Sequence, residues 1–103
     1  FQALQHRCAQ MYCELELAAS AVLQAFSRLD YGVTDISAMA STAKALSNDC
    51  YQLISNEAVQ MHGGMGVTDE LDIGLFLKRS RVCNQLYGDA AWHRNRYARL
   101  KNL

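Results

Sequence analysis

The chain contains no proline and only six glycines among its 103 residues. Strands and the turns that join them normally bring proline, glycine and clusters of β-branched residues, so their scarcity weighs against a β architecture. Half of the residues are hydrophobic, and alanine and leucine are frequent among them. We therefore expect an all-helical chain that forms one domain with a single modest core.

Long apolar runs are also missing. No stretch is long enough to cross a bilayer, and the first residues lack the charged-then-apolar pattern of a secretory signal. We expect no membrane span and a cytoplasmic location. The chain begins at Phe1 rather than at a methionine, which indicates a piece of a longer protein.

The four cysteines show no C-x-x-C spacing, and each falls inside a helical pattern. We interpret Cys8, Cys13, Cys50 and Cys83 as buried, reduced thiols that act as small apolar residues. His62 has no cysteine, aspartate or second histidine at metal-binding spacing. The sequence therefore predicts no metal site.

The net charge is zero, but the charges are unevenly distributed. Residues 1–77 carry nine acidic and three basic side chains, whereas residues 78–103 carry seven basic and one acidic. The bases are interrupted at helical spacing by Trp92, Tyr97 and Leu100, as on an amphipathic helix that packs against acidic neighbours. Because no nucleic-acid-reading element is evident, we expect no nucleic-acid partner.

The first predicted helix carries one apolar stripe at steps of four and three residues. It should end at residues 30–32, where Gly32 suits a left-handed C-terminal cap. The stripe consists of Leu4, Cys8, Met11, Leu15, Ala19, Val22 and Phe26.

The second predicted helix is capped by Thr34 or Asp35 and is rich in alanine and serine. Small side chains let neighbouring helices approach closely, so we expect this helix at the centre of a bundle. Its stripe consists of Ile36, Ala40, Ala43, Leu46, Cys50, Leu53, Glu57 or Ala58, and Met61.

Two further helices complete the pattern. Thr68 is expected to cap the third, with acidic residues in its first turn, where the helix dipole favours them. Gly88 ends the third helix, and Asp89 caps a fourth from about Ala90 to Leu100. Short connections favour antiparallel neighbours, so the predicted architecture is a single antiparallel up-and-down bundle over residues 1–103. The stripe of the third helix is Ile73, Phe76, Ser80, Cys83 and Tyr87.

The run from Glu57 to Gly66 closes the second helix with three glycines within four residues. Such residues accept positive φ and let backbone N–H groups approach a ligand without an intervening Cβ. Gln60 precedes them by one turn, with an amide that both donates and accepts hydrogen bonds. Taken alone, this pattern is more typical of a plain C-terminal cap than of a binding loop.

The register of this segment resembles the C-terminal domain of acyl-CoA dehydrogenases, flavoproteins that desaturate acyl-CoA thioesters. The resemblance extends from Phe1 to about Arg99. It implies that the chain is the C-terminal part of a longer flavoprotein, that Gln60, Gly63 and Gly64 form part of an FAD site, and that the FAD belongs to a neighbouring subunit. It also implies an acyl-CoA substrate, a homo-oligomer or paired subunit, and an electron-transfer partner. The matching residues are Ala58-x-Gln60-x-x-Gly63-Gly64-x-Gly66, Asp69-Glu70 and Arg79-x-Arg81.

One segment departs from this family. Many members carry a glutamate base in a Tyr-Glu-Gly-Thr segment, and an ungapped comparison places Tyr87 at that position. A phenol with a pKa near 10 is a poor base for an α-proton at neutral pH. Asp89 is the nearest carboxylate, although a helix cap suits it better than a base. The catalytic base is therefore unassigned.

Other readings remain open. Glu70 could pair with Arg79 or Arg81 across helices, or these residues could be solvated surface charges. The whole chain could instead be a non-catalytic helical interaction module without flavin, which the colour of the full-length protein would decide. In the family, one long helix of the bundle precedes this region. We therefore expect residues 1–103 alone to self-associate through uncovered apolar stripes, and neither to hold FAD tightly nor to dehydrogenate acyl-CoA.

Overall fold

The computed structural model describes residues 2–32, 34–63 and 72–103. Every regular element in these ranges is an α-helix, which confirms the predicted all-helical fold. The breaks predicted at Gly32 and Gly88 are also confirmed, since both residues have positive φ. The helices are α1 (Gln2–Tyr31), α2 (Ile36–Met61), α3 (Asp72–Gln85) and α4 (Ala90–Leu100).

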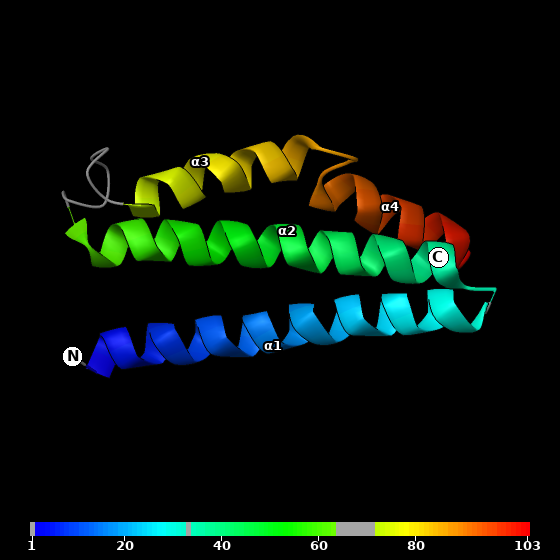
Figure 1. Ribbon diagram of the computed structural model, residues 1–103, viewed down its shortest axis with the longest axis horizontal. Coiled ribbons are helices and arrows are strands. Elements are labelled where there is room, and N and C mark those ends of the chain that lie inside the picture. Colours follow the sequence, from blue (N-terminus) through cyan, green and yellow to red (C-terminus); the bar gives the residue numbers. More distant parts are fainter. Residues whose placement is uncertain (1, 33, 64–71) are drawn as a thin grey trace.

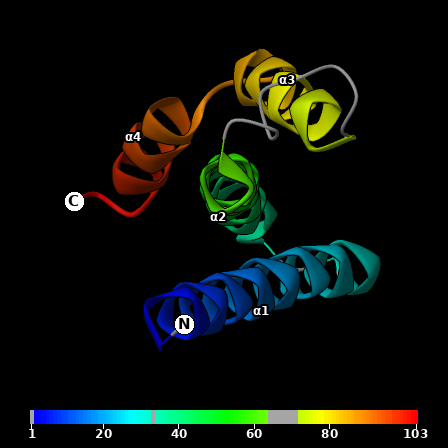
Figure 2. The same cartoon turned by 90° about the vertical axis from the view of Figure 1, so that its left-hand side faces the viewer.

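Helix α2 is the central element, as its small residues predicted. It packs against each of the other three helices. Seen end-on, it lies between α1 on one side and α3 and α4 on the other (Figure 2). Helices α1, α3 and α4 all run opposite to α2, and α4 continues along α2 in the direction that α3 began (Figure 1). The antiparallel relation therefore holds for every helix that contacts α2, while the Gly88 connection does not reverse the chain.

Small and polar side chains line the buried faces of α2. Because serine and alanine project so little from the helix, neighbouring backbones can approach closely. The buried serines and the asparagine all have hydrogen-bond partners, as burial of a polar group requires. These residues are Ala38, Ser41, Ala43, Ala45, Asn48, Cys50 and Ser55.

The connection between α1 and α2 differs from its prediction. Asp35 stands at the N-cap position, but its side chain accepts no hydrogen bond from the helix. Both carboxylate oxygens instead accept from Nη1 of Arg28, at 2.9 and 3.0 Å. The backbone of Asp35 (φ −96°, ψ 22°) lies outside the extended region from which an N-cap side chain normally reaches the first turn. Of the two predicted caps, Thr34 and Asp35, Asp35 does stand at the N-cap position, but the expectation that its side chain caps the helix is wrong.

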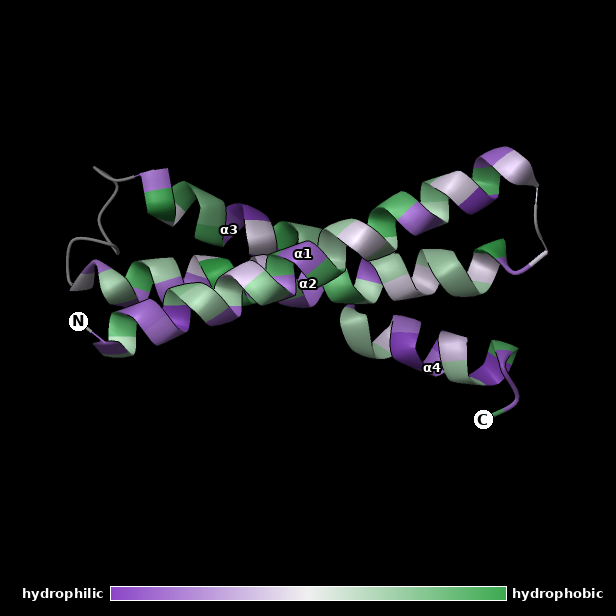
Figure 3. Cartoon of the chain, turned by 90° about the horizontal axis from the view of Figure 1, so that it is seen from below, coloured by the Kyte–Doolittle hydropathy of each residue, from purple (hydrophilic) through white to green (hydrophobic). Residues whose placement is uncertain are grey.

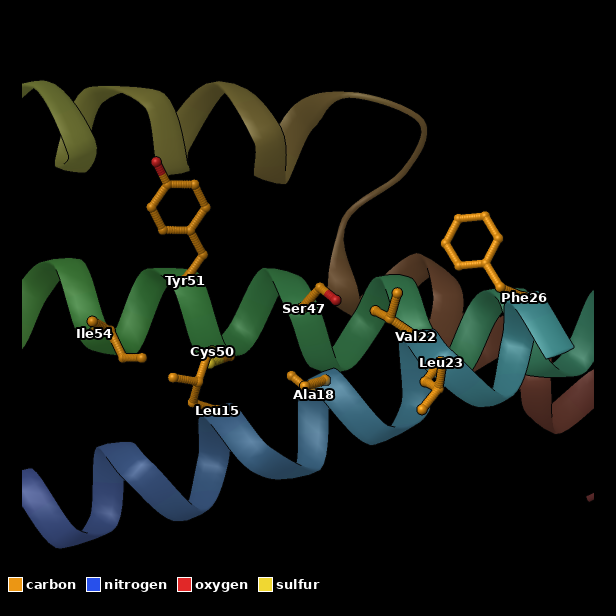
Figure 4. Close-up of a pocket in the computed structure, with 10 residues that line it drawn as sticks. Leu15, Ala18, Val22, Leu23, Phe26, Ser47, Cys50, Tyr51 and Ile54 are labelled. Carbon is orange, nitrogen blue, oxygen red and sulfur yellow. The ribbon is translucent and has the colours of Figure 1, made fainter.

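The predicted apolar stripe of α1 is largely uncovered. Leu15 and Phe26 remain 49% and 61% exposed. Beside them, two adjoining hollows of about 520 and 480 Å³ follow the seam between α1 and α2. Figure 4 shows Leu15 and Val22 of α1 along this seam, with Cys50 of α2 beside Leu15. We call these two hollows the α1–α2 groove.

The cysteines of α1 are likewise more exposed than those of α2 and α3. Cys50 is buried and Cys83 is half-buried, but Cys8 and Cys13 are exposed on α1, so the prediction that all four are buried is wrong for these two. The reason is that α1 has a helix on one side only. Burial raises the pKa of the Cys50 thiol, and the nearby Glu14 carboxylate adds to that effect.

The basic end of the chain forms an amphipathic helix that packs on an acidic neighbour, as predicted. Arg94 of α4 forms an ion pair with Asp49 of α2, and hydrophilic residues dominate α4 (Figure 3). Nearer the C-terminal end of α2, Arg7 of α1 and Glu57 of α2 form a second interhelical ion pair at 3.3 Å. These pairs are partly exposed, so each stabilises the fold by about 0–1 kcal/mol.

Candidate functional site

The C-terminal end of α2 carries two of the three predicted cofactor-binding residues. Gln60 is exposed on the last turn, and Gly63 is exposed two residues beyond the helix, with φ +61°. A Cβ built on Gly63 would meet no described atom within 4 Å, so the backbone there is open to close approach. Gly64, the third predicted residue, lies outside the described residues.

His62, which the sequence left without a role, completes this helix end. Its Nδ1 donates to the carbonyl oxygen of Ala58 at 2.8 Å, and its backbone N–H donates to the same oxygen at 3.2 Å. The last carbonyls of a helix have no intrahelical partner, so these bonds satisfy one of them. Gln60 and Gly63 are thus held at a capped, exposed helix end.

The connection between α3 and α4 is the second candidate region. We call Tyr87, Gly88 and Asp89 the α3–α4 corner. Tyr87 has φ +59° and Gly88 has φ +97°, so two successive residues adopt positive φ. Only glycine fits position 88, because a Cβ there would lie 2.9 Å from Cε3 of Trp92 and 3.0 Å from Nε2 of His93. For Tyr87, the left-handed conformation costs about 1–3 kcal/mol.

Asp89 caps α4, as predicted. Its backbone is extended (φ −83°, ψ 177°), and Oδ1 accepts from the backbone N–H of Trp92 at 2.8 Å. This bond engages one carboxylate oxygen of Asp89 in capping the helix. Tyr87, which the ungapped sequence comparison set at the position of the glutamate base, is 87% exposed and carries a phenol in place of a carboxylate.

Beneath the corner lies a buried polar chain that sequence reasoning missed. Nε2 of His93 lies 2.8 Å from the carbonyl oxygen of Tyr87, and Nδ1 lies 3.0 Å from Oγ of Ser41. Nη1 of Arg96 donates to the same serine oxygen at 3.1 Å. Ser41 is fully buried and His93 is 7% exposed. A carbonyl only accepts, so Nε2 carries a proton, and in the neutral ring the hydroxyl of Ser41 is the donor to Nδ1.

A second contact from α2 reaches the same corner. Nζ of Lys44 donates to Oδ1 of Asn48 at 2.7 Å and to the carbonyl oxygen of Cys83, near the end of α3, at 2.8 Å. Nδ2 of Asn48 donates to the carbonyl oxygen of Gly88 at 3.4 Å. The sequence signal was present, because Ser41, Lys44 and Asn48 recur at helical spacing within a helix otherwise rich in alanine. The residues that these three side chains contact lie 39 to 52 positions away in the chain, and the spacing does not reveal them.

Other predicted residues remain surface groups or lie outside the described ranges. Arg79 and Arg81 are exposed on α3. Their suggested partner Glu70, like the predicted cap Thr68, falls among residues that the structure does not describe. Within the described ranges, no group of three or more histidine, cysteine, aspartate or glutamate side chains could hold a metal ion. No helix described here is long and apolar enough to span a bilayer.

Comparison with known proteins identifies the family. The pattern of the acyl-CoA dehydrogenase C-terminal domain matches residues 1–100. The chain is 35% identical over 88 residues to the acyl-CoA dehydrogenase IpdE2 of Mycolicibacterium smegmatis, covering 85% of this chain and 26% of that protein. It is 34% identical over 96 residues to FadE34 of Mycobacterium tuberculosis, covering 91% of this chain and 14% of that protein.

A solved structure shows the same fold. The crystal structure of a putative acyl-CoA dehydrogenase from Mycobacterium smegmatis superposes with a TM-score of 0.92 at 24% identity, over 99% of this chain and 27% of that one. The chain thus spans about a quarter or less of the length of these relatives. Since the family pattern covers residues 1–100 of the 103, the chain belongs to the acyl-CoA dehydrogenase family and corresponds to its C-terminal domain.

Proposed function

We propose that this chain is the C-terminal helical part of an FAD-dependent enzyme that introduces an α,β double bond into acyl-CoA thioesters. The observation that carries the proposal is the family match over residues 1–100. It is supported by the exposed end of α2, where Gln60 and Gly63 lie in the register that the family uses for flavin contact.

The residues at this helix end fit the polar half of FAD. The C-terminal end of a helix presents carbonyl acceptors, so the donors that a phosphate or ribose needs must come from elsewhere. The Gln60 amide is one such donor, and the open backbone at Gly63 is another. We extend the proposed contact to Gly64 on the resemblance. FAD, when bound, accepts the hydride that leaves the β-carbon.

The α-proton needs a base that the α3–α4 corner does not supply. Tyr87 is a phenol, and Oδ1 of Asp89 already accepts the N-terminal N–H of α4. We therefore place the base outside residues 1–103, in the rest of the protein or in a paired subunit, and keep Asp89 as a cap.

The proposal includes the partners that such a reaction requires. These are an acyl-CoA substrate, at least one further subunit whose flavin meets the α2 end, and a protein that reoxidises the flavin. A cytoplasmic location is part of the proposal. It is supported by the four free cysteines, since a reducing compartment keeps thiols unpaired.

Substitution of Gln60 in the full-length protein tests the flavin contact. We expect Gln60→Leu to lower the amount of FAD that co-purifies, because the leucine cannot hydrogen-bond to the nucleotide. Gln52→Leu is a matched control, since Gln52 is also exposed on α2 but lies two turns earlier. Equal flavin content in both variants would count against the contact.

A second function is favoured by one observation. The α1–α2 groove is almost entirely apolar and open, which suits a helical interaction module that binds no flavin. The two proposals differ in a simple property, because only the first predicts a yellow full-length protein.

A further inference from the structure

The C-terminal end of α2 is less closely packed than the middle of the helix. Ser55 is the last buried residue of α2. On the α3 side of this end, an apolar hollow of about 170 Å³ has Ala58 and Phe76 among its lining residues. On the α1 side, residues 2–6 are exposed, and Arg7 is the first residue of α1 that is half-buried. Apolar packing alone therefore holds this end of α2 only loosely.

One ion pair links this end of α2 to α1. Oε2 of Glu57 lies 3.3 Å from Nη1 of Arg7, and the two side chains are 23% and 43% exposed. The oxygen itself is enclosed, and no described group donates a hydrogen bond to it. The charge of Arg7 therefore compensates this oxygen for the water that it has lost. Without Arg7, the carboxylate would have to turn toward the solvent.

The stability of the fold does not explain a glutamate at position 57. The C-terminal end of a helix carries partial negative charge, which disfavours a carboxylate nearby. Helix α2 has no basic residue in its last turn to offset that effect, so the positive charge comes from α1. A partly exposed ion pair adds little to the overall stability. The pair between Arg7 and Glu57 therefore calls for a local role.

Glu57 precedes Gln60 by three residues, so the two side chains are neighbours on the helix surface. We infer that Arg7 and Glu57 are positioning residues that hold the end of α2 against α1, so that Gln60 and Gly63 meet the FAD of a neighbouring subunit. This inference rests on the proposed function. Arg7 also neutralises the charge of Glu57, which would otherwise repel the phosphates of the nucleotide.

Substitutions of the two partners in the full-length protein test this inference. Arg7→Gln and Glu57→Gln should each raise the dissociation constant for FAD about fivefold, because the last turn of α2 loses its attachment to α1. The double variant should bind FAD no more weakly than Arg7→Gln alone, since either substitution already breaks the pair. Asp49→Asn is the matched control, because it breaks the ion pair with Arg94 on α4, about three turns before Gln60.

Hydrogen exchange gives a readout that needs no flavin. The amides of residues 58–62 should exchange faster in Arg7→Gln and Glu57→Gln than in the parent, and at the parent rate in Asp49→Asn. Parent-like exchange in all three variants overturns the positioning role. Unchanged FAD affinity in Arg7→Gln, or an equal loss in Asp49→Asn, overturns it as well. A full-length parent that binds no FAD refutes the proposed function, and the exchange rates then still decide whether the pair holds the helix end.

Discussion

The hydroxyl oxygens of Ser55 and Ser80 lie 3.1 Å apart at the contact between α2 and α3, and each serine is 3% exposed. Ser55 also lies 2.7 Å from the carbonyl of Tyr51, and Ser80 lies 2.8 Å from that of Leu77. Each hydroxyl has only one proton to donate. In the contact between the helices Ser55 donates to Ser80, and Ser80 donates to the carbonyl of Leu77 on its own helix.

Removal of the Ser80 hydroxyl should weaken this contact modestly. We expect Ser80→Ala to lower the free energy of unfolding by about 0.5–1.5 kcal/mol, because Ser55 keeps a carbonyl partner on α2. Ser80→Leu should cost more, since a larger side chain would force apart helices that meet through small residues. Urea unfolding of the two variants measures the difference, and a leucine variant as stable as the alanine variant would contradict the close packing.

Two glycines with positive φ should respond very differently to alanine. At Gly32 (φ +66°) no described atom would touch the new Cβ, so Gly32→Ala should cost only the backbone strain of about 1–2 kcal/mol. At Gly88 the Cβ would also meet Trp92 and His93 at 2.9 and 3.0 Å. Overpacking adds about 1–3 kcal/mol there. Thermal unfolding should show the larger loss for Gly88→Ala, and equal losses would refute the close approach.

The cysteines should differ in their reactivity with a thiol reagent. Cys8 and Cys13 are exposed and should be alkylated by iodoacetamide well before Cys50, a residue that is 5% exposed and whose thiol has a raised pKa. The raised pKa has a consequence for stability. Above the ordinary pKa of a cysteine, the unfolded chain loses the Cys50 proton first, so the folded state loses stability as the pH rises through that range. Peptide mass spectrometry after timed alkylation measures the order, and early modification of Cys50 would contradict its burial.

The α1–α2 groove should make residues 1–103 self-associate. Leu15, Leu23 and Phe26 on α1 are 49%, 71% and 61% exposed, and a second copy is the simplest surface to cover them. Sedimentation at micromolar concentration should show dimers or larger species. Phe26→Glu should shift the chain toward the monomer, whereas Arg99→Glu on α4 should not. A parent chain that sediments as a monomer would show that the exposed groove does not drive self-association. The same chain alone should show neither tight FAD binding nor turnover of acyl-CoA.

Local signals account for what the sequence predicted well. Gly32, Gly88 and Asp89 mark helix ends through backbone preferences that act within a few residues, and the structure has each of them in its predicted role. Small residues on α2 likewise predicted its central position. Gln60 and Gly63 are placed at an exposed helix end, while their contact with FAD stays a prediction because it depends on another part of the protein.

The failures involve partners that the sequence does not reveal. The carboxylate of Asp35 accepts hydrogen bonds from Arg28 instead of capping α2, because a nearby guanidinium is a stronger donor than a backbone N–H. Cys8 and Cys13 are exposed because nothing described packs on that side of α1. His93 reaches Ser41 across 52 residues, and no local pattern indicates such a contact.

The most direct test of the proposed function uses the full-length protein without oxygen. If the chain is part of an FAD-dependent acyl-CoA dehydrogenase, the purified protein shows the visible absorption of oxidised flavin, and addition of acyl-CoA substrates bleaches it as the hydride reaches the flavin. The bleaching should be weaker in Gln60→Leu, in proportion to its lower flavin content. A colourless full-length protein, or a yellow one whose flavin no acyl-CoA reduces, would contradict the proposal.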